Sequence, residues 1–313
     1  MIQLKDVSKI FAGSDGQDVR AVDQVSLTVA DGETICLIGT SGSGKTTCMK
    51  MINRLIEPTS GTILVGGEDV QSLDPIRLRR RIGYVIQKAG LLPHLTVAQN
   101  IGLLCRLENW PKAKTEKRVR ELLDLVNLEP DQYLRRYPVE LSGGQQQRVG
   151  VARSLALDPS YILMDEPFGA LDPITRDGLH EEFLRLKTEV KKTIVIVTHD
   201  LAEAFKLGDR IVLMSQGRLV QVGTEDDFRY RPENDFVEEF VSHHVANLSL
   251  TVAAAVIEGE CSSAGHPPIL ITAPLRVALS RLLRQEQTEW PVVDQDGDSA
   301  GKVTVESVLK CLS

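Results

Sequence analysis

Residues 39–46, Gly-Thr-Ser-Gly-Ser-Gly-Lys-Thr, have the types and the spacing needed to hold a polyphosphate. Gly39 and Gly44 flank four residues and precede Lys45 and Thr46, which fits the phosphate-binding loop pattern. Glycine lets the backbone wind closely enough for successive N–H groups to face an anion at a helix N-terminus. Lys45 adds a positive charge for the β- and γ-phosphates, and Thr46 offers a hydroxyl to Mg²⁺.

The elements around this loop favour nucleotide binding over the alternative, a flexible glycine-serine linker. Residues 34–38 are apolar and predict a buried strand, and residues 47–55 predict a helix, which is the context that the pattern requires. The residues of the loop expected to contact the nucleotide are Gly39, Thr40, Ser41, Gly42, Ser43, Gly44, Lys45, Thr46 and Thr47.

Two adjacent carboxylates, Asp165 and Glu166, follow the apolar segment 161–164, which predicts a strand covered on both faces. Burying charge without a partner is unfavourable, and Mg²⁺ would supply the partner. We expect Asp165 to bind the metal through a water and Glu166 to polarise the water that attacks the γ-phosphate.

Two more predicted strands end in polar residues: 82–86 ends on Gln87, and 193–197 leads through Thr198 to His199. A lone histidine commonly caps a helix or packs in a core, but its place at a strand end favours a γ-phosphate contact. Ligands of open parallel sheets bind at the carboxyl ends of the strands. The strand ends at Gly39, Gln87, Asp165 and His199 are therefore expected to meet at one polyphosphate.

A helical segment is predicted over about 92–159, where apolar residues recur three and four positions apart in 96–107, 115–126 and 144–157. Residues 141–145, Leu-Ser-Gly-Gly-Gln, directly precede the last of these helices. They could form a simple helix cap, or they could present N–H groups and the helix dipole to a phosphate.

The N-terminal residues 2–29 alternate as antiparallel strands do. Phe11 could stack on an adenine ring or pack in the core. The net charge of -7 makes nucleic acid a poor partner. With no apolar run of a signal or membrane span, the chain is expected in the cytosol. The five cysteines are scattered, which indicates buried, reduced thiols instead of disulfides or a zinc site.

Beyond 247 the composition becomes small and polar, which indicates a domain boundary. A helix over 275–285, strands over 290–293 and 301–305 and a last helix are predicted there. Asp294, Asp296 and Asp298 have the spacing of a calcium loop, but the sixth and twelfth positions are Ser299 and Val305, so a solvated turn at 296–297 is expected.

The order of these motifs resembles the ATPase subunits of ABC transporters, over residues 1–242. Walker A matches residues 39–46, the Q-loop Gln87, the signature 141–145, Walker B 161–165 with Glu166, and the D-loop 170–172. The switch histidine matches His199. The only mild departure is Gly169, where serine is frequent in the family.

The resemblance implies an α/β P-loop fold with a mixed, mainly parallel sheet, an antiparallel β subdomain and an inserted helical subdomain. It implies ATP and Mg²⁺ as cofactors and two copies closing head to tail. Ser142, Gly143, Gly144, Gln145 and Asp172 would then reach the partner copy's nucleotide. Implied catalytic residues are Lys45, Gln87, Glu166 and His199, and implied metal ligands are Thr46, Gln87 and Asp165.

One branch is more similar still, the importers of glycine betaine, choline, carnitine and related quaternary amines. The stretches that carry this likeness are 51–58, 165–176 and 236–240. The resemblance implies a place on the cytoplasmic face of the inner membrane, a permease contacting Gln87 and 88–100, and a separate substrate-binding protein. An importer for amino acids or polyamines and a soluble ABC ATPase are the alternatives. The tail, 247–313, resembles a single CBS repeat, either paired across the dimer or merely structural.

Overall fold

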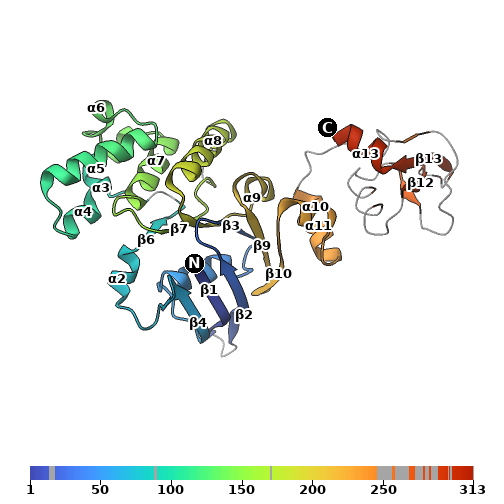
Figure 1. The fold of residues 1–313 in the computed structure, drawn as a ribbon, viewed down its shortest axis with the longest axis horizontal. Helices are drawn as coiled ribbons and strands as arrows, with labels where there is room; N and C mark the ends of the chain where they lie inside the picture. The colour runs from blue at the N-terminus through green and yellow to red at the C-terminus, as the bar shows by residue number, and fades with distance from the viewer. Residues whose placement is uncertain are drawn as a thin grey trace. The chain divides into compact units, whose positions relative to one another are not determined.

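The computed structural model forms two compact units, Met1–Val222 and Gly223–Ser313, each described by itself (Figure 1). Among the described residues, none of the helices combines the length and the apolar character that crossing a membrane requires. The residues that the structure describes are 1–13, 18–87, 90–169, 171–244, 256–257, 268–271, 278, 282, 288–294, 296 and 298–312.

The first unit contains a six-stranded sheet with the order β10-β9-β3-β8-β7-β6. Neighbours from β9 to β6 pair in parallel, and β3 and β8 are buried along their whole length, so both faces are covered. All four apolar strands predicted beside the functional motifs are confirmed. The strands are β3 (Thr34–Ile38), β6 (Ile82–Val85), β7 (Tyr161–Asp165), β8 (Thr193–Val197), β9 (Arg210–Ser215) and β10 (Arg218–Gly223).

A second, antiparallel sheet has the order β2-β1-β4-β5. Its strands are β1 (Ile2–Phe11), β2 (Val19–Val29), β4 (Ser60–Val65) and β5 (Glu68–Asp69). One apolar core joins the two sheets through helix α1 (Lys45–Ile52), where Met49 and Ile52 pack with Ile2 and Leu163. This core fixes α1, and with it the loop that starts the helix, against both sheets.

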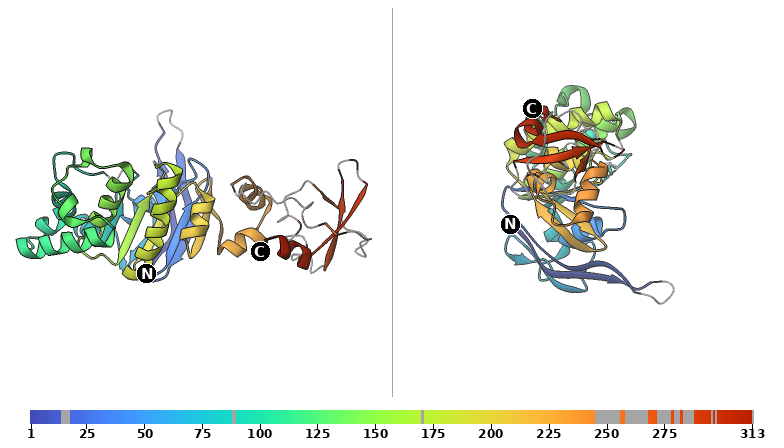
Figure 2. Two further views of the ribbon diagram at one scale, coloured as in Figure 1. Left: turned by 90° about the horizontal axis from the view of Figure 1, so that it is seen from above. Right: turned by 90° about the vertical axis from the view of Figure 1, so that its right-hand side faces the viewer.

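The helices between β6 and β7 lie together at one end of the first unit, away from β1 and β2 (Figures 1 and 2). The single helix predicted over 96–107 is wrong, because Gly102 separates two short helices. A Cβ at Gly102 would lie 2.9 Å from Thr115 Cγ2, so the absence of a side chain at this position allows close packing on α5. These helices are α3 (Val97–Ile101), α4 (Leu103–Leu107), α5 (Lys112–Leu125), α6 (Pro130–Tyr133), η1 (Pro138–Glu140) and α7 (Gly143–Ser154), and a further helix, α2 (Pro75–Arg80), precedes β6.

The helices that precede and follow β8 in the sequence, α8 (Pro173–Val190) and α9 (Leu201–Leu207), complete the first unit. Three thiols in this unit, those of Cys36, Cys48 and Cys105, are free and buried, as predicted. Burial raises the pKa of all three, and that of Cys48 to about 12, so they remain protonated at neutral pH.

The second unit carries a sheet of order β11-β12-β13 around Trp290, which is 1% exposed. The predicted strands at 290–293 and 301–305 are confirmed, except that Val305 begins the last helix, since Thr304 Oγ1 accepts the Ser307 N–H. Most of the predicted helix at 275–285 lies outside the described residues. The elements are α10 (Glu225–Tyr230), α11 (Asp235–His244), β11 (Ile269–Leu270), β12 (Glu289–Val293), β13 (Ser299–Thr304) and α13 (Val305–Leu312).

Candidate active site

The phosphate loop leaves the carboxyl end of β3 in a conformation that requires glycine. Gly39, Gly42 and Gly44 have φ of 142°, 76° and 99°. A Cβ at Gly39 would lie 2.1 Å from Met214 O, and one at Gly44 would lie 2.3 Å from Ala21 O. The outer side of the loop is therefore in direct contact with the backbones of β9 and β2, which leaves its inner side to an anion.

A turn between β9 and β10 holds this loop in place, and sequence reasoning missed it. The Gly217 N–H donates to Ser43 O at 3.1 Å, and Gly217 O accepts the Asp23 N–H at 2.8 Å. The Asp23 carboxylate accepts hydrogen bonds from Arg20 at 2.6 Å and Arg218 at 2.7 Å, which hold its pKa below the ordinary value. The dipeptide Gln216-Gly217 between two apolar runs was the available signal for a tight turn.

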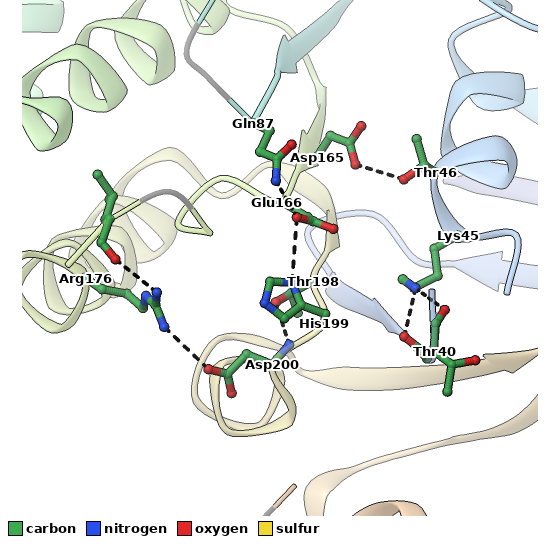
Figure 3. A network of polar contacts seen from close by, with 12 residues as sticks. Thr40, Lys45, Thr46, Gln87, Asp165, Glu166, Arg176, Thr198, His199 and Asp200 are labelled. Atoms are coloured by element: carbon green, nitrogen blue, oxygen red, sulfur yellow. Dashed lines mark hydrogen bonds and ion pairs between the residues drawn. The ribbon is translucent and has the colours of Figure 1, made fainter. Parts of the chain in front are cut away.

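Lys45 turns back into the loop (Figure 3). Its ammonium, in a side chain 7% exposed, donates to Gly39 O at 2.8 Å, Thr40 O at 2.9 Å and Ser43 Oγ at 3.3 Å. Burial lowers the pKa of Lys45, although the carboxylates of Glu166 and Asp165 oppose the shift. A buried cation surrounded by neutral oxygens is a favourable place for a polyphosphate, which would supply the missing negative charge.

Asp165, at the end of β7, faces the first turn of α1. Thr46 Oγ1 donates to Asp165 Oδ1 at 3.1 Å. Burial raises the pKa of Asp165 in spite of this hydrogen bond. The described residues contain no cluster of three or more His, Cys, Asp or Glu side chains suited to a metal. A hydroxyl and one carboxylate nevertheless fit Mg²⁺, which takes few protein oxygens when nucleotide phosphates supply the others.

Three strand ends bring Gln87, Glu166 and His199 together (Figure 3). Gln87 Nε2 donates to Glu166 Oε2 at 2.7 Å, and His199 Nδ1 lies 3.6 Å from the same oxygen. Glu166 has φ 44°, and its N–H donates to Val197 O at 2.9 Å. A glutamate in this left-handed region is strained, so the turn aims the carboxylate at the cost of local stability.

The signature residues lie elsewhere in the same unit. Ser142 Oγ accepts the Gln145 N–H at 3.3 Å, and the Ser142 N–H donates to Gln145 Oε1 at 3.0 Å, a capping box that starts α7. A Cβ at Gly144 would lie 2.7 Å from Thr175 Cγ2, and one at Gly143 would lie 3.4 Å from Leu171 Cδ2. The helix-cap interpretation is thus correct, and the phosphate contact stays a prediction.

Two other predicted nucleotide contacts have local partners. Asp172 Oδ1 caps α8 by accepting the Thr175 N–H at 3.0 Å. Phe11, at the end of β1, is 39% exposed, and the Lys9 ammonium lies 5.0 Å from the centre of its ring. Phe11 is therefore accessible for stacking on an adenine, which stays a prediction.

A central parallel strand that leads into a phosphate loop, with a carboxylate pair two strands away, is the architecture of P-loop nucleoside triphosphatases. A family model described as ABC transporter matches residues 22–169. The glycine betaine/carnitine/choline transport ATP-binding protein OpuCA of Bacillus subtilis is 50% identical over 98% of this chain and 79% of its own. The chain belongs to the ABC transporter family of ATP-binding proteins.

Two further comparisons agree with this assignment. The glycine betaine uptake system ATP-binding protein YehX of Escherichia coli is 44% identical, over 99% of both chains. Among solved structures, the ATP-binding cassette MJ0796, a dimer bound to ADP and Pi, matches with a TM-score of 0.65 and 35% identity, over 72% of this chain and 98% of its own.

Proposed function

We propose that this chain is the ATP-hydrolysing subunit of an importer for osmoprotectant quaternary amines such as glycine betaine, choline or carnitine. The observation that carries the proposal is full-length similarity: relatives named for these solutes align over 98% and 99% of this chain. The candidate active site also supports the proposal, because it contains every type of side chain that ATP hydrolysis needs.

In the proposed reaction the loop backbone and Lys45 bind the phosphates, and Thr46, Asp165 and Gln87 would hold Mg²⁺. Bound Mg²⁺ would neutralise charge on the phosphates. Glu166 orients the attacking water and accepts its proton, because its carboxylate is aimed into the site by the strained turn. His199 lies beside Glu166 and contacts the γ-phosphate.

Two copies are proposed to close head to tail around the nucleotides. The supporting observation is that Ser142 and Gly143 are exposed at the start of α7. Gly143 and Gly144 face Leu171 and Thr175 of the same chain. In such a pair Ser142, Gly144 and Asp172 complete the partner copy's site. We also propose a permease at Gln87 and the following segment to 100, a substrate-binding protein within the complex, and a place on the cytoplasmic face of the inner membrane.

Uptake measurements test the cargo. We expect cells that lose this subunit to lose uptake of at least one of radiolabelled glycine betaine, choline and carnitine, and uptake to return with the wild-type subunit. The Glu166→Gln subunit should not restore it, because transport needs hydrolysis. If uptake of all three amines is unchanged while that of an amino acid or a polyamine falls, the motor assignment stands and the cargo is wrong.

For the domains, we propose an ATPase domain over 1–242, with its helical subdomain at about 92–159, and a CBS-like regulatory or dimerisation domain over 247–313. The compact units divide earlier, after Val222, and Tyr230 of α10 packs against the core around Trp290. Helices α10 and α11 thus belong to the same compact unit as the tail.

Deleting 247–313 tests regulation by the tail. We expect the deletion to change how transport depends on ionic strength, while ATP hydrolysis at low salt stays within about threefold of wild type, because the described active-site residues all precede Val222. Trp290→Ala in the full chain, which removes the largest buried side chain of the tail, should act in the same direction. Unchanged transport across salt concentrations in both variants would exclude the regulatory role.

A further inference from the structure

A buried polar pair joins α8 to α9 behind the candidate active site. The side chains of His180 and Glu203 are 5% and 4% exposed, and His180 Nε2 lies 3.5 Å from Glu203 Oε2. Within the described part of the chain, neither His180 Nε2 nor Glu203 Oε1 makes a hydrogen bond. Because burying a carboxyl group away from water is unfavourable, the polar contact with His180 offsets part of the cost of burying Glu203.

On one side the pair reaches the segment that follows Glu166. The His180 ring packs edge-on against Phe168, with ring centroids 4.8 Å apart and the planes at 90°, a favourable aromatic geometry. Phe168 is itself buried and comes two residues after Glu166. A displacement of the His180 ring would therefore move Phe168, which lies next to the strained turn at Glu166.

On the other side the pair reaches the residue after His199. The Glu203 N–H donates to Asp200 Oδ1 at 3.1 Å, and Asp200 caps α9 through the Ala202 N–H as well. Glu203 thus anchors the first turn of α9 with both its backbone and its side chain. His199 directly precedes this turn, so its position depends on where α9 begins.

Arg176, one helical turn before His180, makes a parallel connection from α8 (Figure 3). Its Nη2 donates to Leu171 O at 3.0 Å, and its Nη1 lies 3.8 Å from Asp200 Oδ2. Residues four apart share one face of a helix. One face of α8 therefore contacts both the loop after Glu166 and the start of α9.

We propose that His180 is a positioning residue that, through Glu203 and Phe168, holds α9 and hence His199 at a fixed place relative to Glu166. The inference rests on the proposed function, because it concerns the geometry of the same hydrolysis site. His180 has no part in the phosphate loop, so its loss is expected to slow turnover and to leave ATP affinity unchanged.

The test compares two substitutions that keep different parts of the His180 side chain. His180→Phe keeps the ring against Phe168 and removes the nitrogen that faces Glu203; we expect kcat for ATP to fall at least about tenfold, because small misplacements of reacting groups are that costly, with KM changed less than about twofold. His180→Gln keeps an N–H donor toward Glu203 but loses the ring contact with Phe168, so its kcat should fall less than that of His180→Phe. The control is Glu181→Ala, which removes the 2.8 Å Glu181–Lys206 pair that joins the same helices at the surface and should change neither constant.

A second readout does not depend on activity. In hydrogen–deuterium exchange of the nucleotide-free protein, peptides covering 199–207 should exchange several-fold faster in His180→Phe and as in wild type in His180→Gln and Glu181→Ala. If His180→Phe does not fold, Glu203→Leu replaces it with the same expectations, because it leaves no carboxylate unpaired.

Equal loss of kcat in the Phe and Gln variants, or equally fast exchange in Glu181→Ala, would overturn the proposal. If the wild-type chain hydrolyses no ATP, the proposed function fails, and the exchange data still decide whether His180 positions α9. The two failures are thus distinguishable.

Discussion

Glu166→Gln is expected to lower ATP turnover at least about a hundredfold while ATP binding remains. The amide keeps the size of the side chain and can accept the Gln87 hydrogen bond, but it cannot take a proton from the attacking water. Because ATP is bound and not consumed, the variant should accumulate as a dimer in the presence of ATP and Mg²⁺. Steady-state phosphate release and size-exclusion chromatography with and without ATP measure the two effects.

The matched control for this prediction is Glu116→Gln, an exposed glutamate of α5 that pairs with Lys112 at 3.8 Å. It should behave as wild type in both measurements, because exposed pairs contribute little. Normal hydrolysis by Glu166→Gln would remove Glu166 from the proposed role. Loss of turnover without an ATP-dependent dimer would leave that role intact and contradict the head-to-tail pair.

Gly39→Ala is expected to abolish ATP binding and to lower the free energy of unfolding by roughly 2–4 kcal/mol. The added Cβ would lie 2.1 Å from Met214 O, a backbone atom of β9 that cannot move without the sheet, and φ is 142° at this position. The loop must then move away from β9, which displaces the Gly39 carbonyl that accepts a hydrogen bond from the Lys45 ammonium. Fluorescent-nucleotide titration and urea unfolding measure the two losses.

Gly32→Ala separates backbone strain from the effect on the site. Gly32 also has a positive φ, 78°, but nothing lies within 4 Å of the added Cβ, and the residue is in the turn before β3. It should lose about 1 kcal/mol of stability and no ATP affinity. If Gly39→Ala binds ATP like Gly32→Ala, the contact with β9 does not shape the loop.

The parts of the site that could be predicted from sequence are those that depend only on neighbouring residues in the chain. Asp165 ends an apolar strand, Glu166 directly follows it and His199 comes two residues after another, and parallel sheets bring such positions to one edge. The break at Gly102 was missed, and so was the close approach of Thr115, a contact between two helices that leaves no room for a side chain at position 102. Helical spacing alone continues through such a glycine.

Other features depend on long-range partners that no local pattern reveals. The contact between His180 and Glu203 joins the helices that precede and follow β8 in the sequence. Taken alone, neither residue differs from an ordinary residue within a helix. The turn at Gly217 was missed although Gln216-Gly217 could have indicated it, but no local pattern could have shown its contact with the phosphate loop. Strand order in the sheet, which places β9 beside β3, decides that contact.

The hydrogen bonds of Gly217 with Ser43 and Asp23 also bear on how the protein is made. They join the beginning of the chain to a turn synthesised much later, and contacts so distant in sequence form only after the intervening chain has been ordered. The residues of the phosphate loop are synthesised early in translation, but the contacts that hold the loop in its anion-binding shape form later. We therefore expect a nascent chain to complete its nucleotide site only once β9 and β10 have emerged, and ATP to stabilise the finished first unit more than its folding precursors.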